Sequence, residues 1–150
     1  MNKPRDLGLL LELAQRRRDA CAQALAQARR ERQQADAQMA QLHAYTHDAD
    51  ARWQQRASAG VSPTLLATHR QFMVKLEEAI GYQTQVLQQL DARIAHHEAQ
   101  LIDAERALAT LQRVQQRWQH DWLRRQQRLE QKAFDEMAAT VHRRRHPPPP

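Results

Sequence analysis

The chain has few residues that interrupt helices, and these few are grouped. Its prolines and glycines fall at Pro4, Gly8, Gly60, Pro63, Gly81 and the run 147–150. Between them lie two long stretches rich in Ala, Gln, Arg, Glu and Leu, which are strong helix formers. This scarcity of turn residues excludes a fold of many short elements and favours two long helices.

Large side chains are also scarce. Two Phe, two Tyr and three Trp are few for 150 residues, and much of the 41% hydrophobic content is alanine. A compact enzyme of this length would need more large apolar residues to fill its core. We therefore expect a core limited to the seam between two helices, with no cleft for a small molecule.

The single cysteine, Cys21, excludes an internal disulfide and is expected to pack as a small apolar side chain. No apolar run approaches the roughly 18 residues that a membrane span needs. Residues 1–13 contain no small-residue cleavage site and include acidic residues, so we expect no signal peptide. These observations predict a cytoplasmic protein.

The sequence contains none of the common catalytic signatures. It has no phosphate-binding glycine loop, no GxSxG and no HExxH, so we expect no enzymatic activity and no cofactor. His43 and His47 are four residues apart, a spacing that can chelate a metal on a helix. No further Cys, Asp or Glu completes a ligand set beside them, so we predict no metal site.

Positive charge is concentrated towards the C-terminus. The formal net charge is +6, and residues 112–146 contain nine basic and four acidic side chains. An acidic protein surface, nucleic acid or an anionic membrane would each complement such a segment. The arginine runs 16–18 and 29–32 point around a helix rather than towards one groove, so the pattern does not favour DNA binding.

The first long stretch, about residues 5–56, has the 3.5-residue repeat of a coiled coil. Alternating steps of four and three give fourteen positions, of which eleven are apolar. These positions are Leu7, Leu11, Ala14, Arg18, Cys21, Leu25, Ala28, Arg32, Ala35, Met39, Leu42, Thr46, Ala49 and Trp53.

The second stretch, about residues 63–140, continues the repeat. Ser62 is a good N-cap and Pro63 suits the first helical position. From Leu66 to Glu136 the same stepping gives twenty-one positions, of which fourteen are apolar, and the pattern is most regular between Leu87 and Leu111. It includes the polar residues Gln83 and Gln115, and it decays after Leu129.

These patterns predict an all-α fold, a long two-helix antiparallel coiled-coil hairpin that forms a single domain over residues 1–146. The bend at residues 57–62 is short, which brings the two helices side by side. The basic, proline-rich tail, residues 141–150, is predicted to be disordered. If the bend centres at residues 59 and 60, Leu7 lies opposite about Gln112, and roughly 25 residues of helix two overhang.

Two regions outside the regular seam are candidates for binding. The overhang carries Trp118, Trp122 and Leu129, and an exposed apolar stripe of this kind often marks a contact site. After the bend, Phe72, Leu76, Ala79 and Gln83 form one i, i+4, i+7, i+11 stripe. This stripe is either a widened core next to the bend or a docking surface, and Gly81 leaves space for another backbone beside it.

These features together resemble the FliJ family of the flagellar type III export apparatus. The similarity covers nearly the whole chain, and the C-terminal block 128–138, RLEQKAFDEMA, is its strongest local match. The other matching segments are 10–14, 42–45 (LHAY), 60–62, 71–72, 76–77 and 79–80.

The resemblance implies a non-enzymatic stalk similar to the γ-subunit coiled coil of rotary ATP synthases. Such a stalk docks in the hexameric export ATPase ring, with the ends of both helices inside it. The expected ring-binding residues lie in the overhang and are Arg113, Arg117, Trp118, Trp122, Arg124, Arg125 and Arg128.

The family also binds the cytoplasmic linker of the export-gate membrane protein and escorts export chaperones. Phe72, Leu76 and Ala79 match the family's gate-binding residues, and Gln83 completes their stripe. The resemblance thus implies a role in flagellum biogenesis and motility, at the inner membrane below the flagellum, without nucleic acid or a small-molecule substrate. The stalk of a virulence type III secretion system and a homodimeric coiled-coil scaffold remain alternatives.

Overall fold

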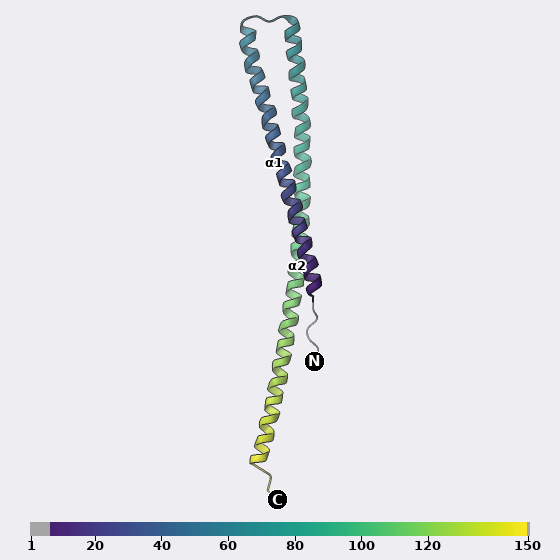
Figure 1. Ribbon diagram of the computed structural model, residues 1–150, viewed down its shortest axis with the longest axis vertical. Coiled ribbons are helices and arrows are strands. Elements are labelled where there is room, and N and C mark those ends of the chain that lie inside the picture. The colour runs from purple at the N-terminus through teal and green to yellow at the C-terminus, as the bar shows by residue number, and fades with distance from the viewer. Residues whose placement is uncertain (1–6, 150) are drawn as a thin grey trace. The chain divides into compact units, whose positions relative to one another are not determined.

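The computed structural model describes residues 7–149, and almost all of them are helical. Helix α1 spans Gly8–Ser58 and helix α2 spans Pro63–Arg145, with no strand in the described part of the chain. The two long helices pack against each other, which confirms the predicted all-α helical hairpin (Figure 1).

The loop between the helices is built as its sequence suggests. Gly60 has a φ of 95°, a left-handed conformation that glycine adopts without steric cost, and it ends α1. The Ser62 hydroxyl accepts a hydrogen bond from the Leu65 backbone N–H at 3.2 Å, so Ser62 caps α2. Pro63 then occupies the first helical position, where a missing N–H costs nothing.

Helix α2 continues past its expected end near residue 140. Residues 141–145, which we expected to belong to a disordered tail, form its last turn. This turn contains His142 and three arginines, and positive charge at a helix C-terminus interacts favourably with the helix dipole. The helix ends just before Pro147, because proline cannot continue the backbone hydrogen bonding.

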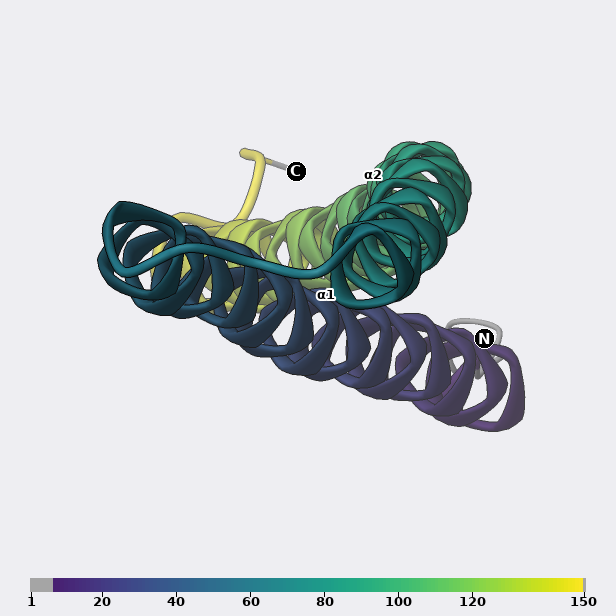
Figure 2. The ribbon, with the colours of Figure 1, turned by 90° about the horizontal axis from the view of Figure 1, so that it is seen from above.

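The chain divides into two compact units. The hairpin unit comprises residues 18–103, and the terminal unit comprises the chain up to residue 17 together with the chain from residue 104 onwards. In the hairpin unit α1 and α2 run antiparallel (Figure 1), and Figure 2 shows from above the loop that joins them. Its buried apolar residues are Leu25, Ala28, Ala35 and Leu90, while Ala104 and Leu108 are buried in the terminal unit.

The seam follows the predicted coiled-coil positions. Every one of the fourteen positions from Leu7 to Trp53 is buried or half-buried, Cys21 included. On α2 the same holds from His69 to Trp122, whereas the later positions from Arg125 onwards are exposed. The repeat thus identifies the packed faces of both helices and the residue at which this packing ends.

At two contacts the observed register differs from the predicted one by about three residues. In the terminal unit the Leu7 backbone N–H donates to Oε1 of Gln115 at 3.2 Å, not to a residue near Gln112. In the hairpin unit the rings of Trp53 and His69 stack face to face. The loop comprises residues 59–62, so its centre lies about one residue later in the chain than we assumed. The pairing is not shifted uniformly, because the hydrogen bond from Gln83 to the backbone oxygen of Ala35 fits the predicted register.

Ion pairs between the helices reinforce this register in the hairpin unit. Arg32 binds Asp36 on its own helix and Asp91 on α2, with 2.8 Å between Arg32 Nε and Asp91 Oδ1. The hydrogen bond that Arg32 donates to Asp91, and next the one that it donates to Asp36, raise the pKa of Arg32 above its usual value. Two further pairs, Arg93–Glu31 at 3.1 Å and Arg29–Glu98 at 3.2 Å, also join the two helices.

Neither helix has a stretch apolar and long enough to cross a membrane. Between residues 7 and 149 no group of three or more His, Cys, Asp or Glu side chains is arranged to hold a metal ion.

Candidate interaction surfaces

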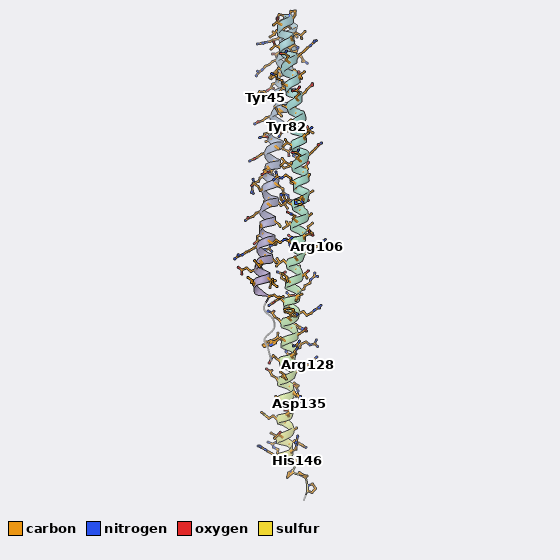
Figure 3. The ribbon with its side chains drawn as sticks, turned by 90° about the vertical axis from the view of Figure 1, so that its right-hand side faces the viewer. Tyr45, Tyr82, Arg106, Arg128, Asp135 and His146 are labelled. Carbon is orange, nitrogen blue, oxygen red and sulfur yellow. The ribbon has the colours of Figure 1, made fainter. Side chains whose placement is uncertain are left out.

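Among the described residues of the terminal unit, no second helix lies beside the C-terminal part of α2. Gln115 lies opposite Leu7, which is the first described residue and directly precedes α1. We call residues 123–145 of α2, which follow the last seam residue Trp122, the free segment. From Gln127 onwards all of its side chains are exposed, and Figure 3 shows Arg128 and Asp135 on a single helix.

The predicted arginines gather on one face of this part of α2. Because a helix turns by about 100° per residue, Arg113, Arg117, Arg124 and Arg128 lie within about 60° of one another around the axis. We call this the basic face. Among the described residues none of these four arginines forms an ion pair with a carboxylate.

Arg125 lies beside the basic face and contributes to a small surface hollow. This hollow, of about 180 Å³, is lined by Asp121, Arg124, Arg125 and Arg128. Asp121 lies close to His120, with 4.0 Å between Oδ1 and Nδ1. Three guanidinium groups around one carboxylate leave a local excess of positive charge that suits an acidic partner.

The two predicted tryptophans belong to the seam rather than to the basic face. Trp118 and Trp122 are half-buried and continue the coiled-coil positions of α2. The indole nitrogen of Trp122 is buried and has no hydrogen-bond acceptor among the described residues. The structure therefore brings the arginines together and places both indoles on a different side of the helix.

A second exposed stripe on the free segment escaped the sequence analysis. Leu123, Phe134, Met137 and Val141 are all exposed, with 68% of both Phe134 and Met137 accessible. Their spacing places them on one side of α2, about 120° around the helix axis from the basic face. The i, i+3, i+7 spacing of Phe134, Met137 and Val141 was visible in the sequence, but it lies outside the coiled-coil repeat that we followed.

The stripe after the bend passes from the surface into the seam. Phe72 is 46% exposed, Leu76 and Ala79 are half-buried, and Gln83 is only 8% exposed. Nε2 of Gln83 donates to the backbone oxygen of Ala35 at 2.9 Å and to Oε1 of Gln38 at 3.2 Å. The first three side chains are accessible to a partner, whereas the Gln83 amide is already bound to α1.

An open groove lies next to the bend, where Figure 1 shows the two helices diverging towards the loop. Its volume is about 580 Å³, and we call it the bend groove. The rings of Trp53 and His69 stack within it at a centroid distance of 4.1 Å and an angle of 4°. Its lining residues are Ala49, Arg52, Trp53, Gln55, Arg56, Ala59, His69 and Phe72. The sequence analysis anticipated no cleft, because the repeat does not show where two helices separate.

Comparison with known protein families decides how these surfaces are to be interpreted. The family described as "Flagellar FliJ protein" matches residues 3–147. The chain belongs to the FliJ family. No individual curated protein matches it.

Membership of the FliJ family makes the chain a component of the flagellar protein export apparatus. This family consists of helical structural components of that apparatus rather than enzymes. The surfaces of this FliJ-family chain are accordingly candidates for contacts within the export apparatus.

Proposed function

We propose that this chain is the stalk of the flagellar export ATPase complex and that its free segment docks in the hexameric ATPase ring. The observation that supports this proposal is the basic face, whose Arg124 and Arg128 lie beyond the last seam residue of α2. Arg113, Arg117, Arg124 and Arg128 lie on one face and have no carboxylate partner in the described chain.

Two physical arguments favour a protein ring as the partner. Long helices gain most of their stability from packing against another element, and the free segment has no such element within the described chain. Its second stripe, formed by Leu123, Phe134, Met137 and Val141, exposes apolar surface that a surrounding protein would bury. A ring encloses a helix from all sides, so it can contact the basic face and the apolar stripe at once.

The gate-binding surface that we propose begins at Phe72 and continues over Leu76 and Ala79. These three residues are at least partly accessible, and they lie on the same side of α2. Gln83 is the inner end of this stripe, and its hydrogen bonds to α1 would hold the stripe in position. A partner segment of the export-gate protein would cover Phe72 and the edge of the seam beside it.

The remaining roles follow from this assignment and are part of the proposal. The chain acts in the cytoplasm, held at the inner membrane below the flagellum by its partners, and it supports motility through export. It also binds export chaperones, and no described surface distinguishes their site. It hydrolyses nothing itself, and it needs neither a cofactor nor nucleic acid.

The decisive experiment measures ATP hydrolysis by the cognate export ATPase with and without the chain. We expect the wild-type chain to stimulate hydrolysis and ring formation, and we expect Arg124→Glu with Arg128→Glu to abolish both effects. The matched control reverses Arg70 and Arg106, which are exposed and lie outside every proposed surface. Equal stimulation by the Arg124 and Arg128 variant and by the wild type would reject the docking of the basic face.

A homodimeric scaffold is the second candidate, because the exposed stripe of Leu123, Phe134, Met137 and Val141 would also fit another copy. The mass in solution separates the two. A monomer by light scattering supports the stalk, whereas a stable dimer that the ATPase does not dissociate supports the scaffold.

A further inference from the structure

The bend groove combines unpaired positive charge with exposed aromatic surface. Arg52 and Arg56 are exposed on its α1 side, and within the described chain neither side chain has a hydrogen-bond or ion-pair partner. Trp53 and Phe72 supply apolar surface beside them. No acidic residue lines the groove.

We propose that the bend groove binds an acidic stretch of the export-gate linker, in which a large apolar side chain lies next to one or two carboxylates. The inference rests on the gate contact proposed above and adds to it the chemistry of the partner. The apolar side chain would lie between Trp53 and Phe72, and the carboxylates would pair with Arg52 and Arg56.

The positions of these residues follow from helix geometry. Ala49, Trp53 and Arg56 are spaced i, i+4, i+7, so they lie on the face of α1 that borders the groove. On α2, His69 and Phe72 are spaced i, i+3 and border it from the other side. The stacked rings of Trp53 and His69 join the two helices, which gives the groove a defined wall before a partner binds.

The charge argument comes from a contrast within the hairpin unit. Farther from the bend, Arg29, Arg32 and Arg93 each pair with a carboxylate on the opposite helix. At the bend groove Arg52 and Arg56 have no such partner, although they are also on the border of the seam. A carboxylate supplied by another protein would complete the same kind of pair, and arginine favours carboxylates because it can bind both oxygens.

Phe72 connects this groove with the proposed gate-binding surface. It lines the groove and it is also the most exposed member of the stripe with Leu76 and Ala79. A segment that lies along this stripe and reaches Phe72 therefore arrives at the groove. The volume of about 580 Å³ is enough for a few side chains of such a segment.

The test measures binding of the fluorescently labelled cytoplasmic linker of the cognate gate protein to the full chain by anisotropy. We expect Arg52→Glu with Arg56→Glu to weaken binding by about tenfold or more, and added salt to weaken binding to the wild type. The control, Arg70→Glu with Arg106→Glu, changes the net charge equally and should stay within about twofold of the wild type. Circular dichroism of each variant verifies that the helices are intact.

A second arm exchanges the charges. Replacing the acidic residues of the linker with lysine should abolish binding to the wild type and restore binding to the Arg52→Glu, Arg56→Glu variant. Restored binding by the exchanged pair would establish that the groove contacts those carboxylates directly.

The outcomes separate this inference from the function on which it rests. If Phe72→Ala with Leu76→Ala abolishes binding but reversal of Arg52 and Arg56 has no effect, the gate contact stands and the acidic groove ligand is rejected. If the wild-type chain does not bind the linker at all, the gate contact and the groove ligand are both rejected. An equal loss in the Arg70 and Arg106 control would show a general charge effect and would also reject the groove.

Discussion

Gln83 is the polar side chain that the described part of the seam buries most deeply, with 8% of its surface exposed. Its amide donates to the backbone oxygen of Ala35 and to the side chain of Gln38, so both of its N–H donors have acceptors. A buried polar residue in a coiled coil is most useful when it fixes the register, because a shifted pairing would leave its donors unsatisfied.

We predict different effects on stability for two substitutions of Gln83. Gln83→Ala removes the hydrogen bonds and leaves a gap, so it should lower the free energy of unfolding by about 1–2 kcal/mol. Gln83→Leu refills the space with apolar atoms and should change that free energy by less than about 0.5 kcal/mol. Urea denaturation followed by circular dichroism measures both values. A loss in Gln83→Leu as large as that in Gln83→Ala would show that the hydrogen bonds outweigh packing.

The exposure of Phe72 favours a role at the surface over a role in the core. Nearly half of its surface is exposed, so Phe72→Ala with Leu76→Ala should reduce binding of the gate linker by about tenfold or more, with little change in helix content. Anisotropy with the labelled linker and circular dichroism at 222 nm measure the two effects separately. Cooperative loss of helix in the double variant at room temperature would instead identify both residues as core.

At the scale of the element, α2 contains one interior glycine, and no contact within the described chain requires a glycine at that position. Gly81 is exposed, and a Cβ added there would meet no atom within 4 Å. Gly81→Ala should therefore raise the free energy of unfolding by about 1 kcal/mol, because glycine is a poor helix former. Thermal unfolding would measure the gain. Weaker binding of the gate linker by this more stable variant would show that a partner backbone approaches at Gly81, and unchanged stability would contradict the helix-propensity argument.

The helices could be predicted from the sequence because the pattern that specifies them is local and recurs every 3.5 residues. The seam positions from Leu7 to Trp53 and from His69 to Trp122 follow from the 3.5-residue repeat alone. The partner of Leu7 was placed about three residues too early on α2, since the register depends on where the loop centres rather than on any repeat. The end of α2 was placed too early. The basic residues of its last turn, among them His142 and Arg143, interact favourably with the helix dipole and extend the helix past its apolar pattern.

The candidate surfaces were predictable only in part. Composition showed that positive charge gathers near the C-terminus, the family resemblance implied which arginines bind, and helical geometry then aligned Arg113, Arg117, Arg124 and Arg128. The bend groove depends on where α1 and α2 diverge, which no local pattern encodes. The repeat did place Gln83 in the seam, where it is only 8% exposed, but it did not show how much of Phe72 remains accessible.

Across the whole molecule, packing and charge are unevenly distributed along the chain. The buried residues of the described chain lie between Leu25 and Leu108, whereas every described side chain after Gln126 is exposed. Positive charge is concentrated where the packing ends, since residues 112–146 contain nine of the 23 basic residues and only four of the 17 acidic ones. The part of the chain with the least internal support thus has the strongest electrostatic attraction for a partner.

This distribution predicts how backbone amides exchange their hydrogens with solvent. Amides in a helix without tertiary packing open locally at low free energy, while those in a packed core open only with global unfolding. Without a partner, amides of residues 123–145 should therefore exchange much faster than those of residues 83–108. Hydrogen exchange monitored by mass spectrometry measures both ranges in one experiment.

Adding the export ATPase ring should slow exchange in residues 113–141, and the Arg124→Glu, Arg128→Glu variant should show no such slowing. Slow exchange of residues 123–145 in the isolated chain would contradict the absence of packing there, and it would point to association with a second copy instead.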